Sequence, residues 1–335
     1  MTRILIGPNA SQARRLAAAA GITAGVVAAW TWAGRDQSAD LSASLVQLPW
    51  QVLGCAAFLL LVTVAHYMCA GAALRGVSNR ALPWREAGLV QLAAAVANRV
   101  VPSGLGGAAV SGRYLLRSGL APGATASALG ALAAVGALSD GAYVAAVTTA
   151  GPIVGVRGAG AEIKALVGHT AASGRQHWWV AAAVVTVVIT FFLTRHRGRL
   201  IRSCVTAVRH AARHLATLVR APGRVAGAAA ASMTTTAVLG VGFVAAVTVW
   251  GHAPKPLPVG ALMALYWVAA AAGNATPLPA FLGVTEAALV GGLGLAGYTS
   301  PSAIFAVVIF RLVTFWLPLP VGIWATRSLR RAELL

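Results

Sequence analysis

Residues 93–107 read AAAVANRVVPSGLGG, and residues 269–283 read AAAAGNATPLPAFLG. Each stretch begins as an apolar helix, passes an asparagine and is then broken by proline and glycine, which end or kink helices. The apolar arms after the breaks have only about 14 residues, and at about 1.5 Å per residue they reach about 20 Å, short of the bilayer's hydrocarbon core of about 30 Å. The pattern predicts two re-entrant hairpins, each built from two half-helices. A pair of full crossings stays open as the alternative for each hairpin, because both arrangements return the chain to the same side of the membrane.

The rest of the chain has the composition of a membrane protein. Of its 335 residues, 58% are hydrophobic and 10% are charged, whereas an ordinary soluble domain has roughly 45–50% and about 25%. Apolar runs of about 20 residues cross a bilayer as helices. Six such runs surround the hairpins, at 16–33, 49–72, 122–150, 178–194, 225–250 and 302–325. The predicted fold is therefore all-α: a polytopic helical membrane protein with about six crossings and two re-entrant broken-helix hairpins.

The chain is strongly basic, with 26 Lys and Arg, seven Asp and Glu, and a formal net charge of +19. In so apolar a chain, this charge indicates loops held at anionic lipid headgroups, and nucleic acid is not an expected partner. With both termini cytoplasmic, the inside segments hold 20 arginines and the outside segments hold five basic residues, as the positive-inside rule requires. Abundant Ala, Val, Gly and Arg with few Lys is typical of GC-rich bacterial genomes, so a bacterial cytoplasmic (inner) membrane is expected.

The two broken stretches belong to an internal repeat. Pro102 matches Pro279 and Gly106 matches Gly283 at a constant offset. Since the first hairpin enters from the inside and the second from the outside, the halves form an inverted repeat of the kind found in transporters. The predicted organisation is a single transmembrane domain, 1–335, with one repeat half at about 45–156, a basic amphipathic cytoplasmic linker at about 195–224 and the second half at about 225–326.

A broken membrane helix exposes backbone N–H groups that hydrocarbon cannot satisfy, so breaks persist where they line a cavity or a ligand. The amides that open the half-helix after Pro102 would suit a phosphate. Arg99 and Arg113 flank this turn, and guanidinium groups bind phosphate in a bidentate manner. For Arg113, snorkelling to the cytoplasmic interface is the alternative. The predicted substrate-binding residues are Asn98, Arg99, Ser103, Gly104, Gly106, Gly107, Arg113, Asn274, Glu286 and Arg311.

Three ionisable residues lie deep in predicted membrane segments: Asp140, Glu286 and Arg311. Because an uncompensated charge at mid-membrane costs about 2.5–3.5 kcal/mol, pairing is expected. Glu286 with Arg311 is the preferred pair, and Asp140 is the alternate partner. A structural salt bridge and a role in substrate binding or proton coupling both stay open for the pair, and Glu286 also suits a helix N-terminus.

Signatures of catalysis and metal binding are missing from the sequence. It contains no HExxH, GxSxG or Walker motif. His210 and His214 are four residues apart, but their segment offers no third ligand. No catalytic residue, metal or cofactor is therefore predicted.

Several motifs resemble the transmembrane region of the lysylphosphatidylglycerol synthase family. They are NRVVPSGLGG from residue 98 and PLPAFLGVTEAALVGGLGL from residue 277, with Gly283, Glu286, Gly297 and Arg311 the most specific positions and PLP at 318–320 behind them. The resemblance covers nearly the whole chain. It implies a flippase-like integral membrane protein that moves lipids between leaflets. Some members are fused to a soluble aminoacyl-transferase domain, which is not expected here, so the resemblance does not imply lysyl transfer.

The residues and the resemblance together predict a flippase-like protein, not an enzyme, that translocates a phospholipid or another phosphate-bearing lipid between leaflets. Its expected partners are membrane lipids with anionic or phosphate-bearing headgroups. Two alternatives stay open: a polytopic membrane enzyme, and a scaffold, each in cell-envelope lipid or glycolipid biosynthesis. A homodimer and complexes with envelope-biosynthesis enzymes are the further partners considered.

Overall fold

The computed structural model describes residues 49–100, 105–150, 213, 216–217, 220–275 and 283–335. These residues form helices joined by short connections, and none of them lies in a strand. The prediction of an all-α membrane protein is confirmed. The predicted crossings at 16–33 and 178–194 lie outside the described residues, as does most of the predicted linker at 195–224.

The same order of helices occurs twice along the chain: one long, two short, one long. The first set is α3 (Pro49–Ser78), α4 (Trp84–Val100), α5 (Leu105–Arg117) and α6 (Pro122–Ala150). The second set is α9 (Pro222–Trp250), α10 (Val259–Ala275), α11 (Val284–Leu295) and a composite of α12 (Ser300–Arg311), η4 (Leu312–Trp316) and α13 (Pro318–Arg331). The inversion of the two halves stays a prediction.

Four of the described helices are long and apolar enough to cross a membrane. They are Trp50–Ser78, Pro122–Ala146, Pro222–Trp250 and the composite Ser300–Arg331. They coincide with four of the six predicted crossings. The helices α4, α5, α10 and α11, which have 17, 13, 17 and 12 residues, correspond to the arms of the predicted hairpins.

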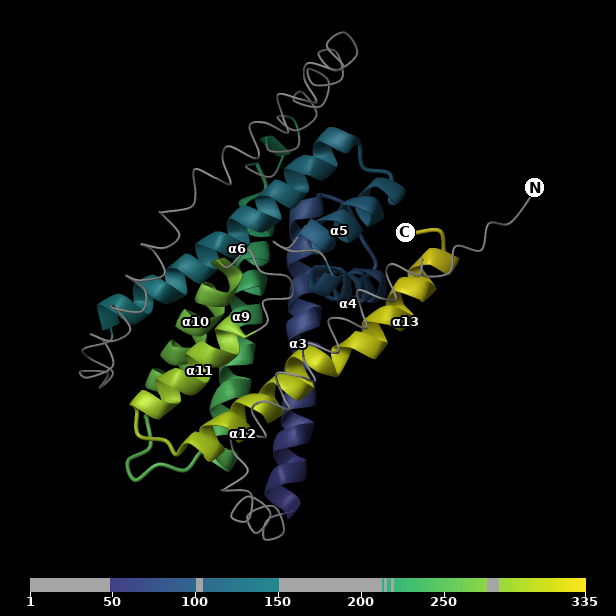
Figure 1. Ribbon diagram of the computed structural model, residues 1–335. Coiled ribbons are helices and arrows are strands. Elements are labelled where there is room, and N and C mark those ends of the chain that lie inside the picture. The colour runs from purple at the N-terminus through teal and green to yellow at the C-terminus, as the bar shows by residue number, and fades with distance from the viewer. Residues whose placement is uncertain (1–48, 101–104, 151–212, 214–215, 218–219, 276–282) are drawn as a thin grey trace, which may run out of the picture.

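The long helices α3 and α9 pack side by side through the middle of the molecule. Figure 1 shows α6 along one side of this pair and α12–α13 along the other, with α4–α5 and α10–α11 between them. Each short pair also contacts the flanking helix of the opposite set, α4 with α13 and α10 with α6. The two halves are therefore interlocked and share the centre of the molecule.

Glycines let the arms of each hairpin approach closely. A Cβ added at Gly106 in α5 would overlap the backbone carbonyl of Ala97 in α4, and one added at Gly273 in α10 would overlap the Thr285 hydroxyl in α11. Small residues at helix contacts are typical of membrane proteins, because backbone approach replaces the hydrophobic effect that is absent in lipid. Both hairpins are thus held closed at the point where each chain reverses.

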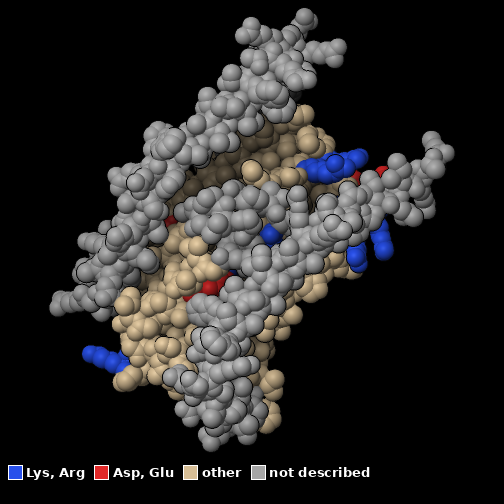
Figure 2. Space-filling view, viewed as in Figure 1, with Lys and Arg blue, Asp and Glu red and all other residues tan. Residues whose placement is uncertain are grey.

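Basic residues from distant segments gather at one end of the molecule. The Arg224 guanidinium donates a hydrogen bond to Asn79 Oδ1 at 2.5 Å. The Cζ atom of Arg75 lies 3.8 Å from the centroid of the Trp84 ring. A buried cluster that includes Val77, Leu82, Ala228 and Leu329 joins the ends of α3, α9 and α13 there. Among the described residues visible in Figure 2, most are uncharged, basic side chains lie at the margins, and a small group of acidic and basic atoms lies near the middle.

Candidate functional site

Glu286 and Arg311 form an ion pair between α11 and α12. Arg311 Nε donates to Glu286 Oε1 at 2.5 Å, and the two side chains are 14% and 23% exposed, Arg311 being the more buried. Glu286 Oε2 also accepts a hydrogen bond from the Gly283 N–H at 3.2 Å. Gly283 has φ 92°, a conformation that favours glycine. Glu286 therefore both caps α11 and pairs with Arg311, and the predicted pair is confirmed.

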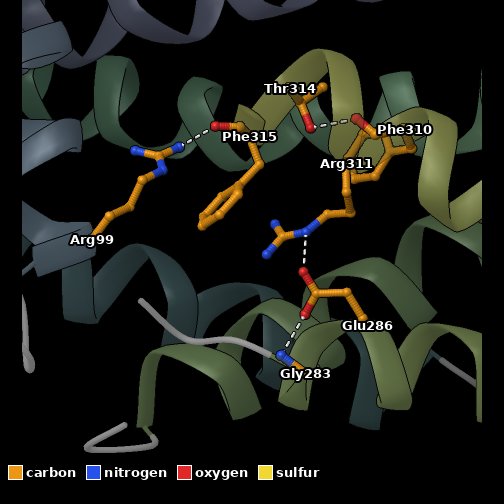
Figure 3. Close-up of polar contacts among 7 residues, drawn as sticks. All are labelled: Arg99, Gly283, Glu286, Phe310, Arg311, Thr314 and Phe315. Carbon is orange, nitrogen blue, oxygen red and sulfur yellow. Dashed lines mark hydrogen bonds and ion pairs between the residues drawn. The ribbon is translucent and has the colours of Figure 1, made fainter. Parts of the chain in front are cut away.

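A second arginine reaches the same place from the other half of the chain. Arg99, near the end of α4, donates hydrogen bonds to the Phe315 carbonyl at 2.5 Å and to the Ala95 carbonyl at 2.6 Å. The Cζ atoms of Arg99 and Arg311 lie 4.0 Å and 4.2 Å from the centroid of the Phe315 ring. Figure 3 shows the two guanidinium groups on either side of this ring, with Glu286 below Arg311 in this view and joined to it by a dashed line. We call Arg99, Glu286, Arg311 and Phe315 the central cluster.

A short π-helical turn places the Phe315 ring. In η4, the Leu317 N–H bonds the Leu312 carbonyl, five residues back, at 2.8 Å. Pro318 follows immediately, and its ring is incompatible with a normal helical bond to residue 314. Thr314 turns its hydroxyl onto the Phe310 carbonyl at 2.7 Å. Because π-helical turns occur frequently at functional sites, this one marks the central cluster as a candidate site.

The central cluster holds more positive than negative charge. Its two guanidinium groups face one carboxylate, and Glu286–Arg311 is the salt bridge found among the described residues. Arg99 interacts with carbonyls, the Phe315 ring and the Tyr67 side chain, and its buried Nε has no hydrogen-bond partner within the described part of the chain. An Arg in a membrane protein normally pairs with an acid or marks a substrate path. The cluster is therefore suited to receive one further anionic group.

The N-terminus of α5 is capped from within the hairpin. Asn98 Oδ1 accepts a hydrogen bond from the Gly107 N–H at 2.5 Å. The sequence predicts a turn at 103–107, but α5 already begins at Leu105, so Gly106 and Gly107 lie inside its first turn and are buried. The Gly107 amide, which the sequence assigned to a phosphate, is bonded to protein in this structure.

Replacing Asn98 by alanine is expected to lower the free energy of unfolding by about 1 kcal/mol, the typical cost of losing a side-chain helix cap. It should also speed hydrogen–deuterium exchange of peptides that contain Gly107. The replacement Asn98→Asp keeps the acceptor oxygen and serves as the matched control. Equal exchange in Asn98→Ala and the parent protein would contradict the capping role.

The other predicted site residues are spread more widely. Arg113 is exposed on α5, and Asp140 on α6 accepts a hydrogen bond from Thr236 at 3.5 Å. Asn274 belongs to α10 but its side chain is not described, and Ser103 and Gly104 lie outside the described residues. Within those residues, no three His, Cys, Asp or Glu side chains come together as a metal site.

Sequence reasoning missed Phe315 and Tyr67. A signal for Phe315 was present, because it follows Arg311 by four residues and such pairs face each other on a helix. No comparable signal existed for Tyr67, which lies on α3 and meets Arg99 on α4 only in the folded protein.

This architecture defines a class: polytopic helical membrane proteins whose broken helices meet at a polar centre. The family model described as "Lysylphosphatidylglycerol synthase TM region" matches residues 16–322. The chain belongs to that family, as its motifs predicted. No match was found among the curated proteins. Family membership ties this membrane protein to lipid biosynthesis or lipid handling.

Proposed function

We propose that the protein is a flippase-like transporter that binds the phosphate of a lipid at the central cluster and carries the lipid between leaflets. The observation that carries the proposal is the convergence of Arg99 and Arg311, one from each half of the chain, on the two sides of Phe315. Glu286 is the carboxylate in contact with Arg311. A single phosphate would balance the remaining positive charge.

The chemistry favours phosphate over the aromatic ring as the partner of both arginines. A cation–π contact contributes about 0.5–2 kcal/mol, whereas hydrogen bonds between two charged groups are roughly twice as strong as neutral ones, and guanidinium presents its donors as a planar fork. A headgroup phosphate that enters between Arg99 and Arg311 would displace the Phe315 ring. Before phosphate binds, the Phe315 ring separates the two guanidinium groups, and its cation–π contacts with both offset part of their mutual repulsion.

Transport requires the site to open to each leaflet in turn. In transporters built from repeats, one half rocks against the other around a site at the midplane. Because Arg99 is in the first half and Arg311 in the second, such rocking would change their separation and release the phosphate. The proposal includes a bacterial cytoplasmic membrane with both termini cytoplasmic. The gathering of Arg75, Arg224 and the end of α13 at one end of the molecule supports a single basic side.

Alanine at Arg99 or at Arg311 is expected to slow the translocation of fluorescent phosphatidylglycerol in proteoliposomes by about tenfold or more, which corresponds to about 1.4 kcal/mol of lost phosphate contact. Arg99→Lys should keep part of the rate, because the charge remains but the planar fork is lost. The measurement is the rate at which added dithionite quenches the fluorescence of labelled lipid that has reached the outer leaflet.

Arg327→Ala is the matched control, since Arg327 is exposed on α13. It should leave the rate unchanged. Unchanged rates in both Arg99→Ala and Arg311→Ala would remove the transport site. Formation of a new lipid product by the purified protein would instead favour an enzyme. Loss of envelope synthesis in cells only when surface residues of the linker are changed would favour a scaffold.

A further inference from the structure

An apolar groove runs along the surface beside the central cluster. It has a volume of about 360 Å³ and lies between α3, α4 and the η4–α13 segment. Its lining is almost wholly aliphatic or aromatic. The residues that line it include Leu60, Val64 and Met68 of α3, Leu89 and Leu92 of α4, and Val313, Leu317 and Val321 of the η4–α13 segment.

The groove has a basic residue in its lining and lies close to the central cluster. Arg85, an exposed residue at the start of α4, is the charged residue in the lining. Tyr67 also lines the groove and interacts with Arg99. Val313 lies two residues before Phe315 in the same π-helical turn. The groove therefore extends from a cationic side chain to the edge of the central cluster.

The open side of the groove is exposed to the surroundings of the protein. Leu60, Val64 and Met68 are 44%, 60% and 41% exposed, and Leu317 and Val321 are each 47% exposed. In a membrane protein, apolar side chains at this position meet lipid chains. A cationic side chain beside an apolar surface attracts lipids with anionic headgroups.

We propose that this groove binds one acyl chain of an anionic phospholipid, with the headgroup at Arg85. The site goes beyond the transport proposal, because it is a place where a lipid is held before its phosphate reaches Arg99. The chain would lie along the aliphatic lining, and Tyr67 would separate its far end from the central cluster. The contact of Tyr67 with Arg99 connects the two sites.

Gly88 provides a way to fill the groove without disturbing the helices. It is buried in the groove lining, and a Cβ added there would meet only the Met68 sulfur at 3.5 Å, an ordinary contact. A leucine at this position would occupy the space assigned to the acyl chain. Gly130 on α6 is the matched control, since it is exposed and an added Cβ would meet nothing within 4 Å.

The test uses the full chain in nanodiscs that contain phosphatidylglycerol with a photoactivatable diazirine on one acyl chain. Mass spectrometry of the crosslinked protein is expected to find label in peptides covering residues 60–68, 85–92 and 313–321. Gly88→Leu should reduce this label by about fivefold or more, close to 1 kcal/mol of binding free energy, and Gly130→Leu should not. Arg85→Gln should remove the preference for phosphatidylglycerol over phosphatidylcholine.

Label that is insensitive to Gly88→Leu, or that is spread evenly over the lipid-facing helices, would overturn the acyl-chain site. So would equal labelling by the two lipids in the parent protein. Crosslinking measures occupancy whether or not lipid is moved. A labelled groove combined with transport that is insensitive to both Arg99→Ala and Arg311→Ala would therefore contradict the transport proposal alone.

Discussion

Replacing Glu286 by alanine is expected to lower the free energy of unfolding by about 3 kcal/mol, near the lower end of the 3–5 kcal/mol found when one partner of a buried ion pair is removed. The side chains of Arg311 and Glu286 are 14% and 23% exposed. The loss of stability should therefore be smaller than for a fully buried ion pair. Removal of Glu286 leaves Arg311 and Arg99 as two cations on one aromatic ring. It also removes the acceptor for the Gly283 N–H at the start of α11.

The two roles of Glu286 are separable by a second replacement. Glu286→Gln keeps an oxygen that accepts from Gly283 but removes the charge, so its cost should fall between those of the parent and Glu286→Ala. A double-mutant cycle with Arg311→Met measures the coupling directly. The readout is chemical unfolding in detergent micelles followed by tryptophan fluorescence.

Glu333, exposed close to the C-terminus, is the matched control, and Glu333→Ala should change stability by no more than about 0.5 kcal/mol. A coupling energy near zero between Glu286 and Arg311 would mean that the ion pair contributes little to stability. The cost of Glu286→Ala would then come from the cap of α11 alone.

Gly106→Ala is expected to lower the free energy of unfolding by about 2–3 kcal/mol, in the range for overpacking a close contact. The added methyl group would overlap the carbonyl oxygen of Ala97. That oxygen is backbone, so relief requires α4 and α5 to separate, which also pulls Asn98 away from the Gly107 amide. The loss should appear in unfolding midpoints and in faster exchange of peptides from α5.

Two comparison variants test this explanation. Gly130→Ala, where nothing lies within 4 Å, should stabilise α6 by about 0.5–1 kcal/mol through helix propensity. Gly273→Ala overlaps the Thr285 side chain, so a second replacement, Thr285→Ala, should restore its stability. No side-chain replacement should rescue Gly106→Ala. Wild-type stability in Gly106→Ala would mean that the hairpin is more open than the structure shows.

Local sequence predicted most of the helices correctly. Proline and glycine end helices wherever they occur, so the breaks after Asn98 and after residue 275 were visible without any tertiary information. The same holds for long apolar runs, of which four appear as long helices in the described residues. Glu286 and Arg311 were paired correctly because charges in a membrane need partners.

The geometry of the candidate site was not predictable in the same way. Arg99 and Phe315 are 216 positions apart, and their hydrogen bond exists because α4 packs against α13 and the turn after Arg311 is π-helical. The hydrogen bond of Asn98 within the hairpin was not predicted either. The Asn98 oxygen reaches the Gly107 amide only because the two arms of the hairpin are in contact.

The sequence by itself determined that this is a helical membrane protein, where its helices break, and which deep charges need neutralising. These properties follow from the free-energy cost of burying polar groups and charges in hydrocarbon. That cost depends on the residues of each segment and not on how the segments pack together. Only the tertiary structure decided that Arg99 and Arg311 share Phe315, that Asn98 accepts the hydrogen bond of the Gly107 amide, and that an apolar groove lies beside the cluster. Those features depend on the relative placement of helices distant in sequence, which is set by close packing and by the absence of side chains at a few glycines.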